Sequence, residues 1–266
     1  MDFRALQLAL RSRGFSSVMA NARIAHDIIL NAIKEAGFMD KVTIKGGVVM
    51  SGVSNDVRRA TMDMDLDFLH YSLGDSAIQR FVSKLNRFAG CRVELVGEIQ
   101  ELRQQEYRGK RFYLALTDEN GLVVKTKLDV GVHTREDVRQ HIFGFEVVSR
   151  KSQVRLFVNS REQIFVEKLK SLLLLGPISN RYRDVYDMYY LSGDIRKRVL
   201  KQYIQQYIFD DAKMFENDFD AIIVRLKKVF SNKLYVKRLA QPKNAWLDVP
   251  ATEVINGLLE FIRSLP

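Results

Sequence analysis

Three aspartates at alternate positions, Asp63, Asp65 and Asp67, carry the strongest chemical signal in the chain. The positions between them, Met64 and Leu66, are apolar. This alternation predicts a β-strand, on which residues two apart share a face. Carboxylates held that close repel one another, and a divalent cation such as Mg²⁺, which binds carboxylate and phosphate oxygens, relieves the repulsion. The alternative is an exposed acidic strand edge, which discourages pairing with another sheet.

A glycine turn lies upstream of this strand. Residues 42–44 form a short β-rich run, Gly46 and Gly47 follow Lys45 directly, and we expect a helix to start at Val48. Strand, glycine turn and helix start make a phosphate-binding arrangement, because glycines let backbone N–H groups approach oxygens closely. A Gly-Gly pair alone is more often only a tight turn. Followed by an Asp-x-Asp strand, it favours a nucleotide site.

A hairpin further along the chain carries another carboxylate. Residues 111–116 and 122–130 alternate on either side of a turn at 118–121, which predicts two antiparallel strands. Lys127 and Asp129 share a face of the second strand. If that strand pairs beside the acidic strand, Asp129 completes a site of three carboxylates. Otherwise the two residues are an ordinary solvent-facing lysine and aspartate.

Length and composition narrow the class of protein. The 266 residues suffice for one large domain or two ordinary ones. The net charge of +10 favours a polyanionic partner, either nucleic acid or nucleotide, and the alternative is a basic surface kept for solubility. The single cysteine, Cys91, excludes an intramolecular disulfide and a cysteine zinc cluster. Neither a membrane span nor a signal-peptide core is visible, so we expect a cytoplasmic protein without membrane partners.

The order of the elements suggests two domains. Helical patterns precede residue 37, strands dominate residues 91–148, and helices follow residue 160. We therefore expect a mixed α/β domain with N-terminal helices over 1–158 and an α-helical domain over 159–266. The helices expected after the first strands cover residues 75–89, 194–208, 211–230 and 249–265. Trp246, the only tryptophan, is expected in the core.

Taken together, these motifs resemble the nucleotidyltransferase superfamily in its AbiEii/AbiGii branch of type IV, MenT-like toxins. The resemblance rests on Lys45-Gly46-Gly47, Arg59-x-Thr61-x-Asp63-x-Asp65, Lys127-x-Asp129, Glu167-Lys168-Leu169 and Arg183-Asp184-x-x-Asp187-x-x-x-Leu191. Each motif is short, but their order and spacing are specific. The superfamily's usual Gly-Ser is Gly46-Gly47 here, so backbone amides take over from the serine hydroxyl. Thr61 offers a hydroxyl nearby.

The resemblance implies an α+β fold: a polymerase-β-like mixed sheet with helices, followed by an α-helical C-terminal bundle. It implies Mg²⁺ or Mn²⁺ as cofactor and catalytic roles for five residues, of which the aspartates at 63, 65 and 129 bind metal: Asp63, Asp65, Asp129, Lys168 and Asp184. It implies that the nucleotide contacts Lys45, Gly46, Gly47, Arg59, Thr61 and Lys127. Lys168 would hold phosphates, unless it is a surface lysine. Asp184 would serve the acceptor, unless it is a structural partner of Arg181 or Arg183. The roles of Asp67 and Asp187 are open.

The activity implied is transfer of a nucleotide from an NTP to RNA, a tRNA 3′ end first of all, by the toxin of a toxin–antitoxin or abortive-infection system with a cognate antitoxin. One alternative keeps the enzyme and changes the acceptor to a small molecule, as in antibiotic resistance, or to a protein hydroxyl. Another is a catalytically idle binding module. For RNA we expect phosphate and base contacts from Arg181, Tyr182 and Arg183. We also expect a basic surface on the helical half, from Arg225, Lys227, Lys228, Lys233, Lys237, Arg238 and Lys243.

Overall fold

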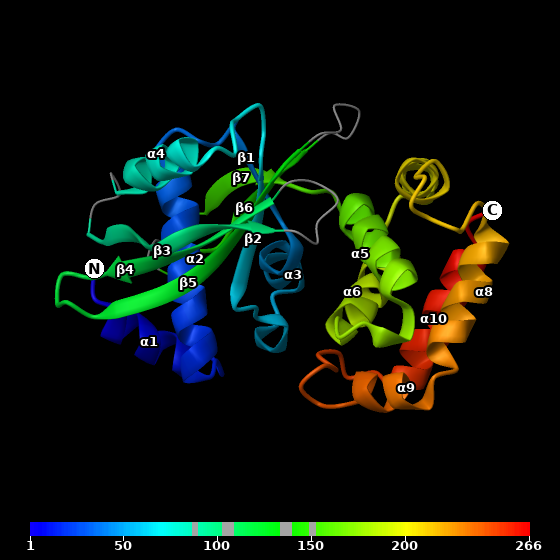
Figure 1. The fold of residues 1–266 in the computed structure, drawn as a ribbon. Coiled ribbons are helices and arrows are strands. Elements are labelled where there is room, and N and C mark those ends of the chain that lie inside the picture. Colours follow the sequence, from blue (N-terminus) through cyan, green and yellow to red (C-terminus); the bar gives the residue numbers. More distant parts are fainter. Residues whose placement is uncertain (87–89, 103–108, 134–139, 149–152) are drawn as a thin grey trace. The chain divides into compact units, whose positions relative to one another are not determined.

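The computed structural model describes residues 1–86, 90–102, 109–133, 140–148 and 153–266 (Figure 1). The chain divides into two compact units, Met1–Asn159 and Ser160–Pro266. The end of the helix expected over 75–89 lies outside these residues, and the described part of that helix is α4, Asp75–Leu85. Within the described ranges, none of the helices combines the length and apolar character that crossing a membrane requires.

Unit 1 is built on a mixed seven-stranded sheet with the strand order β3-β4-β5-β2-β1-β7-β6. Its strands are β1 (Val42–Lys45), β2 (Asp63–Phe68), β3 (Arg92–Leu102), β4 (Gly109–Thr117), β5 (Val123–Val132), β6 (His141–Phe145) and β7 (Val154–Val158). The pairs β2–β5 and β1–β7 are parallel, and the other neighbours are antiparallel. The predicted acidic strand and the predicted hairpin are confirmed, and β7 adds a strand beyond those predicted.

The apolar half of β2 explains why its acids share one face. Met64, Leu66 and Phe68 are fully buried. Burying each such side chain stabilises the fold by about 1.5–3 kcal/mol, and a slip of one residue would turn all of them to the opposite face. The register of β2 is therefore set by its apolar residues. The aspartates necessarily take the other face of the sheet.

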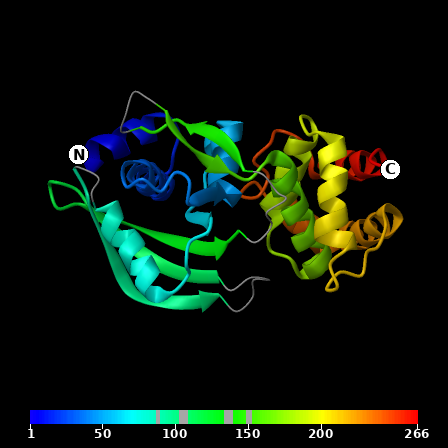
Figure 2. The same ribbon diagram turned by 90° about the horizontal axis from the view of Figure 1, so that it is seen from above.

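Helices pack on the sheet, and one of them starts at the glycine turn. They are α1 (Phe3–Ser12), α2 (Ser17–Glu35), α3 (Gly46–Ser54), the 3₁₀ turn η1 (Val57–Arg59) and α4. Helix α2 packs on β5 and β7, and α4 lies over β3 (Figure 1, Figure 2). Ser16 caps α2, because its hydroxyl accepts a hydrogen bond from the Met19 amide over 3.3 Å. Helix α3 begins at Gly46 itself, two residues before the expected start.

Unit 2 is helical in every element the structure describes, as predicted. It contains α5 (Arg161–Leu175), η2 (Gly176–Ile178), α6 (Tyr182–Ser192), α7 (Lys197–Ile204), η3 (Gln205–Phe209), α8 (Phe219–Phe230), α9 (Lys233–Leu239) and α10 (Ala251–Arg263). The single helix expected over 211–230 is wrong in its first third, because the Asp218 carboxylate accepts from the Ala221 amide and caps α8 there. Trp246 is buried, as expected.

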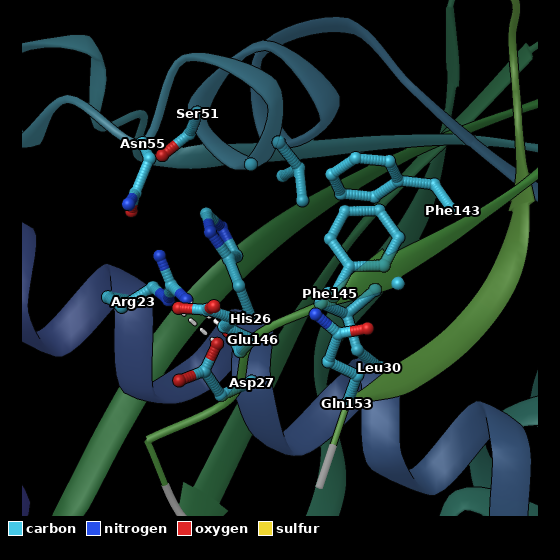
Figure 3. A pocket seen from close by; sticks show the side chains of 13 residues that line it. Arg23, His26, Asp27, Leu30, Ser51, Asn55, Phe143, Phe145, Glu146 and Gln153 are labelled. Atoms are coloured by element: carbon cyan, nitrogen blue, oxygen red, sulfur yellow. Dashed lines mark hydrogen bonds and ion pairs between the residues drawn. The ribbon is translucent and has the colours of Figure 1, made fainter.

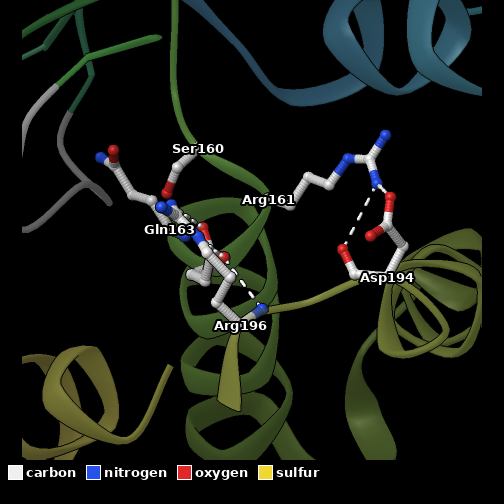
Figure 4. A network of polar contacts seen from close by, with 6 residues as sticks. Ser160, Arg161, Gln163, Asp194 and Arg196 are labelled. Atoms are coloured by element: carbon white, nitrogen blue, oxygen red, sulfur yellow. Dashed lines mark hydrogen bonds and ion pairs between the residues drawn. The ribbon is translucent and has the colours of Figure 1, made fainter. Parts of the chain in front are cut away.

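A polar network fixes the start of α5 (Figure 4). The Ser160 hydroxyl accepts from the Gln163 amide over 3.1 Å and caps the helix. The Glu162 carboxylate accepts from the Arg196 backbone amide over 3.1 Å and from its guanidinium over 2.9 and 3.2 Å. Arg161 pairs with Asp194. These contacts hold α5 against the segment that leads into α7.

Candidate active site

A row of charged residues crosses four neighbouring strands of unit 1. Lys45 on β1 is the register partner of Asp65 on β2, Asp65 is the partner of Asp129 on β5, and Asp129 is the partner of Arg111 on β4. Register partners share a face of the sheet, and neighbouring strands lie about 4.8 Å apart. The row thus places two carboxylates side by side between two cations.

Ion pairs link this row to the residues on either side. Arg111 binds Asp129 through two parallel hydrogen bonds of 2.8 Å from Nε and Nη2. Lys127 Nζ lies 2.8 Å from Asp63 Oδ2, and Lys45 Nζ lies 2.7 Å from Asp67 Oδ1. The role of Asp67, left open by the sequence, includes an ion pair with Lys45. Each of these carboxylates is neutralised by a side chain of the same sheet face.

The glycine turn is shaped around the side chains that face it. Gly46 has φ +64°, and a Cβ there would lie 2.6 Å from Asp65 Oδ2. A Cβ on Gly47 would lie 2.8 Å from Thr61 Oγ1. Both positions therefore need glycine, the first for its backbone conformation and both for the close approach. The Asp65 carboxylate and the Thr61 hydroxyl consequently rest against the first residues of α3.

The start of α3 has the properties of an anion site. Its N-cap residue, Lys45, makes no side-chain hydrogen bond to the first turn. The first amides of a helix point outward and carry a partial positive charge, which favours phosphate oxygens. Of the other expected nucleotide contacts, Lys45 and Lys127 lie on the acidic face through their ion pairs. Arg59 differs, because η1 buries it to 4% exposure.

The acidic face fits a divalent cation by its donor chemistry. Asp63, Asp65 and Asp129 offer hard carboxylate oxygens, and the missing Cβ of Gly46 lets the Asp65 carboxylate lie against the start of α3. Across the residues that the structure describes, no three acidic, histidine or cysteine side chains are already grouped to hold a metal ion. A cation held by all three would therefore replace contacts that Lys127 and Arg111 now make. Their side chains are 22% and 32% exposed, so water can take over part of those contacts.

In unit 2 the predicted Lys168 and Asp184 lie together. Lys168 Nζ contacts the Asp184 carboxylate and lies 2.9 Å from Asp187 Oδ2. The interpretation of Lys168 as a surface lysine is wrong, because it is 9% exposed. Asp184 forms an ion pair with Lys168, and its neighbour Asp187 is fully buried. The expected base contact from Tyr182 is also wrong, because that ring is buried against Tyr235 with centroids 5.2 Å apart.

Arg111 is a residue of this site that the sequence analysis missed. Its pairing with Asp129 depends on the strand register, and a turn at residues 118–121 would have placed Arg111 opposite Leu128, one residue short of the observed partner. Gly131 was missed for a similar reason. It is the register partner of Asp67, and a Cβ there would collide with the Asp67 carboxylate.

One comparison with known proteins, the match to a family model, agrees with the motifs. The family model described as nucleotidyl transferase AbiEii toxin, Type IV TA system, matches residues 28–246, well over half of the chain. Among solved structures, the chain resembles an antigenic nucleotidyltransferase-like protein from Paracoccidioides brasiliensis, with 16% identity, a TM-score of 0.44, and coverage of 80% of this chain and 92% of that one. A comparison with curated proteins gave no match. The family match shows that this chain belongs to the AbiEii nucleotidyl transferase toxins of type IV toxin–antitoxin systems.

Proposed function

We propose that this nucleotidyltransferase moves a nucleotide from an NTP to an RNA acceptor, a tRNA 3′ end first of all, with Mg²⁺ as its metal. The observation that carries the proposal is the pairing of Asp65 with Asp129 beside the helix start at Gly46 and Gly47. Carboxylates and outward amides at one place are what a metal-bound triphosphate needs. Mn²⁺ is the alternative metal, because it binds the same oxygen donors.

The chain's own groups divide the work of the reaction. Asp63, Asp65 and Asp129 would hold the metal, which when bound neutralises phosphate charge and stabilises in-line displacement. Amides at the start of α3 bind phosphate oxygens. The acceptor hydroxyl forms a bond to the α-phosphorus, the bond to pyrophosphate breaks, and the hydroxyl proton passes to a carboxylate of the acidic face. Lys45 and Lys127 contribute positive charge on that face.

For unit 2 we propose a role in the acceptor step. Asp184 is 18% exposed at its side chain, so it is accessible to an acceptor hydroxyl. Lys168 orients the Asp184 carboxylate through their ion pair, and its role is not only to hold phosphates. The buried Asp187 carboxylate in turn holds the Lys168 ammonium in place. In this arrangement Lys168 is a positioning residue. Its loss would weaken both the pair and the packing of α5 on α6.

Charge supports RNA as the acceptor. Six basic residues of the expected surface are exposed on α8, α9 and the segment that follows: Lys227, Lys228, Lys233, Lys237, Arg238 and Lys243. Arg225 has a structural role instead, because its Nε donates to the Leu173 carbonyl over 3.1 Å. Exposed cations bind phosphates along a strand, and such binding weakens steeply with salt. The family implies a cognate antitoxin as a further partner, and we propose the cytoplasm as the place of the reaction.

Incubation of the chain with each labelled NTP, Mg²⁺ and total RNA tests the proposal. We expect label on RNA of tRNA size, at the 3′ end, and none when Mg²⁺ is chelated. RNA affinity should fall between low and physiological salt. Label that appears only on protein or on a small molecule while RNA is present would overturn the RNA acceptor. Transfer that persists without divalent metal would overturn the metal assignment.

A further inference from the structure

Unit 1 contains a cavity of about 240 Å³ beside α3 (Figure 3). Its walls come from α2, from one side of α3 with Asn55 after it, and from β6 with Glu146 after β6 and Gln153 before β7. The acidic residues of β2 and β5 do not line it. Its volume is that of roughly eight water molecules in the liquid, which suits one ring system and is too small for a whole nucleoside triphosphate.

A buried histidine acceptor defines the chemistry of the cavity. His26 is 4% exposed and lines the cavity from α2 (Figure 3). Burial lowers the pKa of its imidazole to about 4, although a hydrogen bond to the Met62 backbone opposes that change, so the ring is neutral at pH 7. Its Nε2 has no hydrogen-bond partner among the described residues. A neutral ring that donates from Nδ1 keeps a lone pair on Nε2, and burying that acceptor without a donor is costly.

The charged groups in the wall are used by the fold itself. Arg23 Nε lies 2.7 Å from Asp27 Oδ1, and its Nη2 donates to the Glu146 carbonyl. The Asp27 carboxylate also accepts from the Val148 amide over 2.8 Å. These contacts fasten the segment after β6 to α2. Because the cation of the wall is matched by its own carboxylate, a neutral ligand suits the cavity better than a phosphate.

The remaining wall combines aromatic rings with amides. Phe143 and Phe145 stand edge to face, with centroids 4.9 Å apart, and a Cβ on Gly52 would lie 2.9 Å from Phe143 Cε1. The rim carries Asn55, at the end of α3, and Gln153, before β7. An amide side chain both donates and accepts, so it can match the edge of a planar heterocycle. Flat apolar surface, paired amides and a deep acceptor together are the features of a nucleobase pocket.

We infer that this cavity binds a neutral nucleobase, whose N–H donates to His26 Nε2 while Asn55 and Gln153 contact its polar edge. The base can come from a free nucleoside or from an unstacked position of single-stranded RNA. The cavity is separate from the acidic face, and the inference stands whether or not the proposed transfer to RNA is correct.

Titration of the full chain with adenosine, guanosine, cytidine and uridine, without divalent metal, tests the inference. We expect at least one nucleoside to bind in the millimolar range or tighter and to shift the ¹⁵N resonance of His26 Nε2, as a new hydrogen bond does. Single-stranded RNA oligomers form the second arm. Binding of an oligomer about tenfold tighter than the nucleoside would assign the base to RNA, and equal or weaker binding would assign it to a free nucleoside.

Variants of α3 locate the site. Ser51→Leu fills the cavity and should weaken nucleoside binding about tenfold or more, whereas Ser54→Leu, on the same helix but outside the lining, should leave binding unchanged. Asn55→Gly keeps the left-handed backbone, φ 50°, and removes the amide, so binding should weaken. Because nucleoside binding is measured without divalent metal, it separates this inference from the transfer reaction. An unshifted His26 Nε2 with every nucleoside and oligomer, or undiminished binding by Ser51→Leu, would overturn it.

Discussion

Both units pair carboxylates with cations, but at different depths. On the acidic face of unit 1 the Asp63 side chain is 49% exposed and its partner Lys127 is 22% exposed. In unit 2 the Asp187 side chain is fully buried and its partner Lys168 is 10% exposed. The first pair can exchange its partner for water, metal or phosphate. The second pair is part of the interior and cannot be replaced without disturbing the packing.

This difference separates stability from activity. An exposed ion pair stabilises a fold by about 0.2–1 kcal/mol, whereas removing one partner of a buried pair costs about 3–5 kcal/mol. Substitutions at Asp63 and Asp65, the half-buried acids of the acidic face, should therefore affect catalysis with little change in the free energy of unfolding. Substitutions at Lys168 or Asp187 should lower that free energy first.

The largest effect is expected from Asp65→Asn, which keeps the volume of the side chain and removes its charge. Nucleotide transfer should fall by about 10²–10³-fold or more, because a preorganised electrostatic contact to the reacting groups is lost. The free energy of unfolding should change by less than about 1 kcal/mol. Label transfer and urea unfolding measure the two quantities. Asp75→Asn, which removes the carboxylate that pairs with Lys110, is the control and should retain transfer. Full transfer by Asp65→Asn would remove it from the site.

Lys168→Met should give the largest loss of stability. It leaves the buried Asp187 carboxylate without its lysine, and we expect the free energy of unfolding to fall by about 3–5 kcal/mol. Lys170→Met, on the same helix, is the matched variant. Its partner Asp211 also accepts from the Lys213 amide over 2.8 Å, so a smaller loss is expected. Equal losses for the two variants would show that the depth of the carboxylate, 0% exposed for Asp187 and 15% for Asp211, does not set the cost of losing the lysine.

The sequence predicts the acidic face better than the buried cluster, for a physical reason. A strand has a period of two, so the alternation at residues 63–68 identifies both the element and the face. Helix α5 buries Glu162, Gln163, Lys168 and Lys170 together with apolar residues, which removes the polar stripe that reveals a solvent face. The depth of Lys168 could therefore not be read from its helix alone.

Contacts between segments that are distant in the chain also could not be predicted from the sequence. The ion pair of Arg111 with Asp129 follows from the strand register, and the turn expected at residues 118–121 gives a register that is off by one residue. The cavity near His26 draws on α2, α3 and β6, and nothing local marks residues 26, 52 and 143 as neighbours. Side chains that meet only through the tertiary fold leave no periodic signal, so the acidic face was predictable and the cavity was not.

The pH dependence of stability gives a further test within unit 1. The cavity wall holds two buried groups, Asp27 and His26, whose pKa values shift in opposite directions. Burial raises the pKa of Asp27 from 3.8 to about 6, against the opposing effect of Arg23. Its contribution to stability is therefore full at low pH and is lost as pH rises toward 6. Burial lowers the pKa of His26 from 6.5 to about 4. Its contribution is full above pH 6.5 and is lost as pH falls toward 4.

In the native chain these two contributions oppose each other between pH 4 and pH 6.5. Each amounts to about 3 kcal/mol, at about 1.36 kcal/mol for each pKa unit. Asp27→Asn should therefore gain stability steadily as pH rises from 4 to 6.5, and His26→Phe should lose stability from pH 4 to 6. Urea unfolding across this range gives both slopes. Parallel pH profiles for the two variants would show that neither group titrates as its burial dictates.

The smallest effect on stability is expected at the glycine turn, where a substitution adds volume and changes no charge. A Cβ on Gly47 would lie 2.8 Å from Thr61 Oγ1 and 3.0 Å from Thr61 Cβ, so Gly47→Ala should cost about 1–3 kcal/mol by overpacking. Gly193→Ala in unit 2 is the matched control, because the atom nearest to its Cβ would be 3.7 Å away and φ is −72°. Thr61→Ala removes the hydroxyl and should restore part of the loss in the double variant, a coupling that unfolding of all four chains measures. If Thr61→Ala restores nothing, the contact between this hydroxyl and the start of α3 does not explain why glycine stands at position 47.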